Sequence, residues 1–210
     1  MEELVNRVKN IIDICWESFS AKVGCGLISI NKEASMQLQF AYLLKNSLDL
    51  AIYNNDESVE LELETGIPVN GRLRECDIVM RMVKGESKLY LPIEMKCYKT
   101  KTSTGKLRGA QDIFKLGVYE DLQLLEAYAN ASYASGIQLT MTDSRNFVYP
   151  KSKEAKSWDY DISDGHKIKG GINLNTPIGG KPVNVKLNLD YSFKWAQVNN
   201  YYFLKLESND

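Results

Sequence analysis

The segment spanning residues 74–96 limits the fold of this chain more than any other part of the sequence. Residues 73–83 are rich in Val, Ile and Met, residues 84–87 read Lys-Gly-Glu-Ser, and an alternating apolar pattern resumes over residues 89–97. Two such runs, separated by a short segment that contains glycine, are typical of antiparallel strands joined by a turn. The chain is therefore expected to contain a sheet built around this hairpin.

The second strand of the predicted hairpin has two different faces, because successive side chains of a strand point in opposite directions. Its apolar face consists of Leu89, Leu91, Ile93, Met95 and Cys97. Its other face carries Glu94 and Lys96, after Lys88, Tyr90 and Pro92. The hairpin therefore places an acid and a lysine side by side.

Asp77 lies in the middle of the first strand, among apolar residues. A carboxylate in such a place is costly unless it is paired, hydrogen-bonded or bound to a metal. In a purely structural interpretation, Asp77 pairs with Arg74 or Arg81, and Glu94 pairs with Lys96. In a functional interpretation, the three residues Asp77, Glu94 and Lys96 form a site.

The flanking sequence predicts further helices and strands by its periodicity and its turn residues. The expected elements are a packing helix within residues 1–20, a helix over 31–52 with Asn31 as its N-cap, a half-solvated strand over 59–67, a helix over 110–130 and a strand over 132–142. Beyond residue 143 the chain is rich in glycine and aromatic residues, and strands are expected over 172–175, 183–189 and 201–206.

This order of elements indicates a single domain of the α/β (α+β) class covering residues 1–210. Its core, about residues 31–142, would be a central mixed β-sheet flanked by helices in the order αβββαβ. Residues 1–20 would pack against this core, and residues 143–210 would form a β-rich C-terminal appendage.

Composition excludes several classes of protein. The formal net charge is −1, so a nucleic-acid partner would have to be held by local patches. The four cysteines have no zinc-type spacing, which favours reduced thiols. The acidic start of the chain does not look like a signal peptide, and no apolar run reaches membrane-spanning length, so a cytoplasmic location and no membrane partner are expected.

A basic segment follows the hairpin directly. Residues 96–108 contain no acid, and the basic side chains after Lys96 are Lys99, Lys101, Lys106 and Arg108. Such a segment is either a solvated loop or a loop that contacts phosphates. Its position next to Lys96 favours phosphate contact.

The spacing of Asp77 and the Glu94-x-Lys96 pair on neighbouring strands resembles the PD-(D/E)xK nuclease superfamily, which includes many type II restriction endonucleases. The resemblance covers residues 31–142, because the expected αβββαβ order is also the common core of that superfamily. Cys76 precedes Asp77 where the motif often has proline, and Pro92 lies two residues before Glu94.

The resemblance implies a restriction-endonuclease-like core and a Mg²⁺ ion, for which Mn²⁺ could substitute. Asp77 and Glu94 would supply hard oxygen ligands, together with the backbone carbonyl of Met95. Lys96 would orient or help to deprotonate the attacking water and stabilise developing charge. A supporting acid is expected as well: Glu33 at the start of the helix over 31–52 or Glu64 near the end of the first strand.

The implied activity is a Mg²⁺-dependent endonuclease that hydrolyses phosphodiester bonds of duplex DNA, as type II restriction endonucleases do. A homodimer is expected, since both strands must be cut and two-fold symmetric pairs are the commonest oligomers. The alternatives are a repair or defence nuclease acting on single-stranded, branched or RNA substrates, and a catalytically inactive relative that binds nucleic acid or protein.

Overall fold

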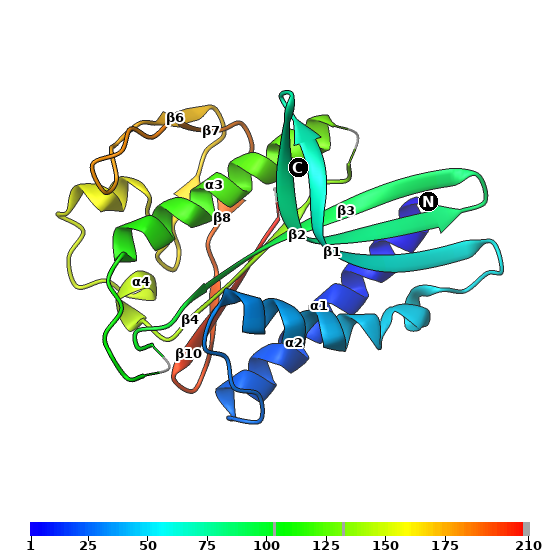
Figure 1. Ribbon diagram of the computed structural model, residues 1–210, viewed down its shortest axis with the longest axis horizontal. Helices are drawn as coiled ribbons and strands as arrows, with labels where there is room; N and C mark the ends of the chain where they lie inside the picture. The colour runs from blue at the N-terminus through cyan, green and yellow to red at the C-terminus, as the bar shows by residue number, and fades with distance from the viewer. Residues whose placement is uncertain (103, 132, 208–210) are drawn as a thin grey trace.

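A computed structural model of the chain describes residues 1–102, 104–131 and 133–207. Its centre is a six-stranded sheet with the strand order β1-β2-β3-β4-β10-β9. Strands β3 and β4 are parallel, and the other neighbours are antiparallel. The expected mixed sheet flanked by helices is therefore confirmed (Figure 1).

The predicted hairpin is present and slightly longer than expected. Strand β2 (Arg72–Lys84) pairs with β3 (Ser87–Tyr98) from Ile78 opposite Ile93 to Lys84 opposite Ser87. Strand β1 (Glu57–Val69) pairs with β2 on its other side. The predicted strands are each one or two residues short at either end, because the strands run on into their turns.

Two helices cover the apolar face of the hairpin. Helix α1 (Glu2–Gly24) and helix α2 (Glu33–Lys45) bury their apolar side chains against a core that includes Leu91, Ile93 and Met95. In this layer the ring of Trp16 stacks on Phe19, with the ring centroids 5.4 Å apart. The predicted packing role of the first helix is confirmed.

The helix predicted over residues 31–52 with Asn31 as its N-cap starts one residue later than expected, and its predicted C-terminal end is wrong. Helix α2 begins after Lys32, and a separate 3-10 helix, η1 (Leu48–Ala51), follows it. The break has a local cause: the Asn46 and Ser47 side chains donate hydrogen bonds to the Tyr42 and Leu43 carbonyls. Side chains of these types compete with the helical backbone and favour helix ends.

Helix α3 (Gln111–Asn130) covers the opposite face of the sheet, and β4 (Ile137–Thr142) follows it. The predicted strand over 132–142 starts too early, and Ser132 lies outside the described residues. Gly136 precedes β4 at a close approach, because a Cβ atom there would come within 2.9 Å of the Pro92 carbonyl oxygen and 2.5 Å of the Leu125 side chain.

The C-terminal part of the chain supplies two strands of the central sheet. Strand β10 (Tyr201–Leu206) pairs with β4, and β9 (Trp195–Val198) forms the sheet edge. The strands expected over 172–175 and 183–189 are present in shorter form as β6 (Ile172–Leu174) and β7 (Val185–Leu187), which pair with each other in antiparallel fashion. The remaining short elements are α4 (Arg145–Val148), η2 (Lys156–Asp159), β5 (Lys167–Ile168) and β8 (Tyr191–Ser192).

The β1–β2 hairpin bends away from the sheet at Glu64. This residue has a left-handed backbone with φ 50°, and it interrupts the pairing between Leu63 opposite Ile78 and Thr65 opposite Cys76. A non-glycine residue with a positive φ is uncommon, and strained residues of this kind cluster at active sites. Beyond the bend, the distal half of the hairpin rises at the top of Figure 1 and packs Ile67 against Leu125 and Tyr128 of α3. Within the described ranges, none of the helices is long and apolar enough to cross a membrane.

Candidate active site

The predicted site residues lie where strands β2 and β3 separate. The backbone pairing of the two strands ends at Ile78 and Ile93. One residue earlier on β2, Asp77 uses its side chain instead: its Oδ2 atom accepts a hydrogen bond of 2.6 Å from the Met95 amide. The Asp77 carboxylate therefore takes the place of a backbone partner and is fixed next to Glu94 and Lys96.

Glu94 and Lys96 point from β3 toward helix α3. Glu94 is buried, with 4% of its surface exposed, and its Oε1 atom accepts a hydrogen bond of 3.0 Å from the Tyr128 hydroxyl. The Nζ atom of Lys96 lies 3.2 Å from Asp121 Oδ1 and 3.6 Å from Glu33 Oε1. Among the described residues, the ion pairs of the purely structural interpretation are not formed: Lys96 pairs with these two acids, Arg81 pairs with Glu60, and Arg74 does not pair with Asp77.

Both candidate supporting acids reach the site. Glu33, in the first turn of α2, accepts a hydrogen bond of 3.1 Å from the Cys97 amide and contacts Lys96. Glu64, at the bend in β1, accepts a hydrogen bond of 2.7 Å from the Gln37 side chain. Gln37 also donates a hydrogen bond of 2.8 Å to the Asp77 carbonyl. Glu33 therefore contacts the lysine directly, whereas Glu64 is tied to the backbone of Asp77.

Asp121 was not expected at the site. Phe114, Gly117, Asp121, Leu125 and Tyr128 are three or four residues apart, so they share one face of α3. The sequence does contain a signal for this residue, because Asp121 is an acid in the middle of an otherwise apolar stripe of the predicted helix.

Glycine at position 117 gives the Lys96 side chain room on helix α3. A Cβ atom at this position would lie 3.2 Å from Lys96 Cε. Gly117 and Asp121 are one helical turn apart, so the lysine chain passes the first and its ammonium group pairs with the second. The helix thus shapes the position of the lysine.

The acids of the site hold protons more strongly than usual. Burial, followed by the charge of neighbouring acids, raises the pKa of Glu94 to about 9. Burial also raises the pKa of Asp121 to about 7 and that of Asp77 to about 6, although the nearby Lys96 partly opposes both shifts. For Lys96, burial favours the neutral form, but the surrounding acids outweigh it and raise the pKa. Lys96 is therefore a cation at neutral pH.

These residues are better suited to one hard cation that keeps several waters than to a metal site in which the protein supplies every ligand. Within the described part of the chain, no group of three or more His, Cys, Asp or Glu side chains is arranged to hold a metal ion. Mg²⁺, however, keeps several waters and is commonly bound through one or two carboxylates. Asp77 and Glu94 each use one oxygen in a hydrogen bond, and the buried Asp121 Oδ2 atom has no partner. Asp77, Glu94 and the Met95 carbonyl are the groups that would hold the ion.

The basic loop borders a cavity of about 380 Å³ beside the site. Lys96 and Glu33 line this cavity at one side, and Arg108 and Glu120 line it as well. Arg108 also donates a hydrogen bond to the Asn31 carbonyl.

The lysines of this loop differ in how freely they face solvent. Lys99 pairs with Asp143 at 3.1 Å and donates a hydrogen bond to the Tyr201 hydroxyl. Lys101 and Lys106 are exposed. Lys99 is therefore committed to internal contacts, and the other two lysines remain accessible to a ligand.

Searches of family models, curated proteins and solved structures find no match to this chain.

Proposed function

We propose that this protein is a Mg²⁺-dependent endonuclease that hydrolyses phosphodiester bonds in duplex DNA, with a restriction-endonuclease-like core. The observation that carries the proposal is the hydrogen bond between Asp77 and the Met95 amide. It fixes one acid of a neighbouring strand against the segment that presents Glu94 and Lys96. A second acid and a lysine beside a positioned carboxylate are the groups that metal-assisted phosphodiester hydrolysis needs.

Each side chain has a distinct role in this proposal. A Mg²⁺ ion at Asp77 and Glu94 would neutralise the phosphate and lower the pKa of a bound water. Lys96 stays protonated because Asp121 and Glu33 surround its ammonium group. A lysine in this state orients the attacking water and stabilises negative charge that develops on the phosphate, but it is a poor base.

Cleavage of plasmid DNA by the full chain tests the proposal. The incubations contain Mg²⁺, Mn²⁺ or a chelator, and the proteins are the wild type, Glu94→Gln, Lys96→Met and the control Lys88→Ala. Lys88 is exposed at the start of β3, beside the far end of β2. Metal-dependent cleavage that both site variants abolish and the control retains would support the proposal. Intact DNA at every metal and sequence tested would overturn it.

The same assay separates the substrate classes. Single-stranded DNA, branched DNA and RNA are compared with the duplex under identical conditions. Preference for single-stranded DNA, branched DNA or RNA over the duplex would assign the protein to the repair or defence nucleases instead. The homodimer that we propose for cutting both strands is checked by the mass of the protein in solution with and without DNA.

One observation favours a second candidate, a nucleic-acid-binding relative without catalysis. Lys96 is held by two acids, and within the described ranges no cluster of three acids is arranged around a metal position. Such a protein would bind DNA in a salt-sensitive way without cutting it, and Asp77→Asn would leave the binding intact.

A further inference from the structure

The distal half of the β1–β2 hairpin forms an arm over helix α3, and we call residues 65–76 the hairpin arm. The arm exists because the chain bends at Glu64, opposite Asp77 in the pairing. Its inner side is anchored by Ile67 and Cys76, which pack with Leu125 and Tyr128. The arm therefore begins beside Asp77.

Three neighbouring cavities with shared lining residues follow helix α3 from the basic loop to the hairpin arm, and we call them together the trough. Two cavities of about 310 and 360 Å³ share Arg74, Gln123 and Leu124 as lining residues. The first of them also shares Glu120 with the 380 Å³ cavity beside Lys96 and Arg108. The trough thus extends from Arg108 of the basic loop, past Lys96, to Arg74 and Arg72 of the arm.

Positive charge lies at both ends of this trough. Arg72 and Arg74 line it at the arm, both are exposed, and neither makes an ion pair with another described residue. Arg108 lines it at the opposite end. Glu120 lies between the ends, where the charges of Lys96 and Arg74 act on it. Both arginines of the arm lie on strand β2, two residues apart.

We propose that this trough holds a DNA strand on both sides of the cleaved phosphate, with Arg72 and Arg74 of the hairpin arm contacting phosphates on the side away from Arg108. This inference rests on the proposed function and extends it to the path of the substrate. Arginine is suited to this role, because its planar guanidinium binds phosphate oxygens in pairs. Since the trough extends to both sides of Lys96, a DNA strand that binds in it needs no free end.

Binding measured without cleavage tests the path of the strand separately from the chemistry. A fluorescent DNA duplex and the corresponding single strand are titrated with the full chain in chelator over a range of salt concentrations. For two lost phosphate contacts, Arg72→Ala/Arg74→Ala should reduce the salt slope by about 1.8 with the duplex or about 1.4 with the single strand. The conservative pair Arg72→Lys/Arg74→Lys should keep the wild-type slope.

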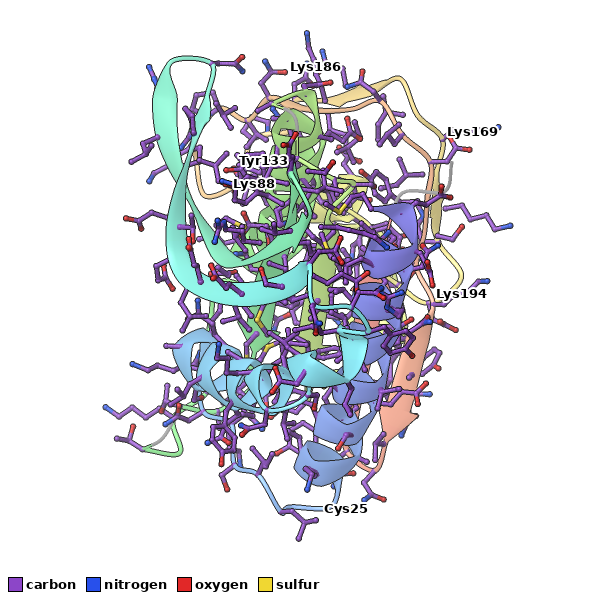
Figure 2. The ribbon with its side chains drawn as sticks, turned by 90° about the vertical axis from the view of Figure 1, so that its right-hand side faces the viewer. Cys25, Lys88, Tyr133, Lys169, Lys186 and Lys194 are labelled. Atoms are coloured by element: carbon purple, nitrogen blue, oxygen red, sulfur yellow. The ribbon has the colours of Figure 1, made fainter. Side chains whose placement is uncertain are left out.

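The control variant removes equal charge elsewhere. Lys88 and Lys194 are both exposed, and Figure 2 shows Lys194 on the opposite side of the molecule from the arm. Lys88→Ala/Lys194→Ala should leave the salt slope unchanged. An equal fall in slope for the control and arm variants would overturn the proposal, as would an unchanged slope in the arm variant.

Circular single-stranded and duplex DNA then test the open path. Opening of circles that lack any end is the expected result, and activity restricted to linear DNA would contradict a trough that is open on both sides. If the wild type cuts nothing while the arm variants alter binding as expected, the proposed function fails and the binding path stands.

Discussion

The ammonium group of Lys96 lies 3.2 Å from Oδ1 of Asp121, an acid that helix α3 carries into the centre of the site. The other oxygen of Asp121 is buried and has no partner. Together with Glu33, this acid raises the pKa of Lys96 in spite of its burial. The charge on the lysine, on which its proposed role depends, is therefore maintained by a residue outside the Asp77 and Glu94-x-Lys96 pattern.

Replacing Asp121 by Asn should lower kcat for DNA cleavage by roughly 10-fold to 100-fold, the usual effect of losing a group that orients a site residue. KM and the Mg²⁺ concentration for half-maximal activity should change little, since Asp121 is placed to act through Lys96. Steady-state kinetics over a Mg²⁺ series measure all three quantities. A variant with wild-type kcat would show that Asp121 serves folding alone.

Replacing Gly117 by Ala should make the protein more stable and less active. Alanine in a helix interior is favoured over glycine by roughly 0.5–1 kcal/mol. The added Cβ atom, however, would lie 3.2 Å from Lys96 Cε, so the lysine must shift by a few tenths of an ångström. We expect a melting temperature raised by about 1–4 °C and a several-fold fall in kcat. Equal activity in the two proteins would mean that the lysine relocates without consequence.

The parts of the fold that follow from local pattern were predictable, and the parts set by long-range contact were not. The hairpin and the two faces of β3 follow from alternation alone. The pairing of β10 with β4 joins residues about 60 positions apart, and no local pattern reports it. For the site, the motif located Asp77, Glu94 and Lys96. The bridging role of Gln37 depends on how α2 crosses β2, which the sequence does not reveal.

Glu94 should make the metal-free protein less stable as the pH rises. Its pKa is raised to about 9 in the folded state, above the usual value of about 4.3 in an unfolded chain. The folded state therefore binds the proton more tightly, and its advantage is lost as the pH rises from about 4 to about 9. Glu94→Gln should stay close to the wild type at pH 5 and exceed its stability at pH 9 by several kcal/mol, since a shift of one pKa unit corresponds to about 1.4 kcal/mol.

Thermal unfolding in chelator at the two pH values measures this difference. The comparison with the variant at each pH removes the contributions of other titrating groups, such as Lys115, whose pKa burial lowers to about 8. Added Mg²⁺ should raise the melting temperature of the wild type at pH 9 and leave that of Glu94→Gln nearly unchanged. Parallel pH curves for the two proteins would contradict the expected proton binding.

Glu126 should stabilise the attachment of the C-terminal segment to α3. Its buried carboxylate accepts hydrogen bonds from the Asn188 amide and side chain, the Leu189 amide and the Tyr191 hydroxyl. Glu126→Ala leaves these donors without their acceptor and should lower the free energy of unfolding by roughly 2–4 kcal/mol. Urea unfolding of the wild type and the variant measures this difference in the free energy of unfolding. A loss below about 1 kcal/mol would show that water or another group replaces the carboxylate.

Two substitutions at Asp77 separate its structural contact from its charge. Asn retains an oxygen that can accept the hydrogen bond from the Met95 amide, whereas Ala retains none. Because burial raises the pKa of Asp77 to about 6, removing its charge should cost little stability in the absence of metal. We therefore expect Asp77→Asn to unfold at nearly the wild-type temperature and Asp77→Ala to lose roughly 1–3 kcal/mol of its free energy of unfolding.

Both Asp77 variants should lose cleavage activity by at least about 100-fold, since Mg²⁺ binding needs the carboxylate. Retained activity in Asp77→Asn would remove Asp77 from the metal site and leave it as a strand-end hydrogen bond.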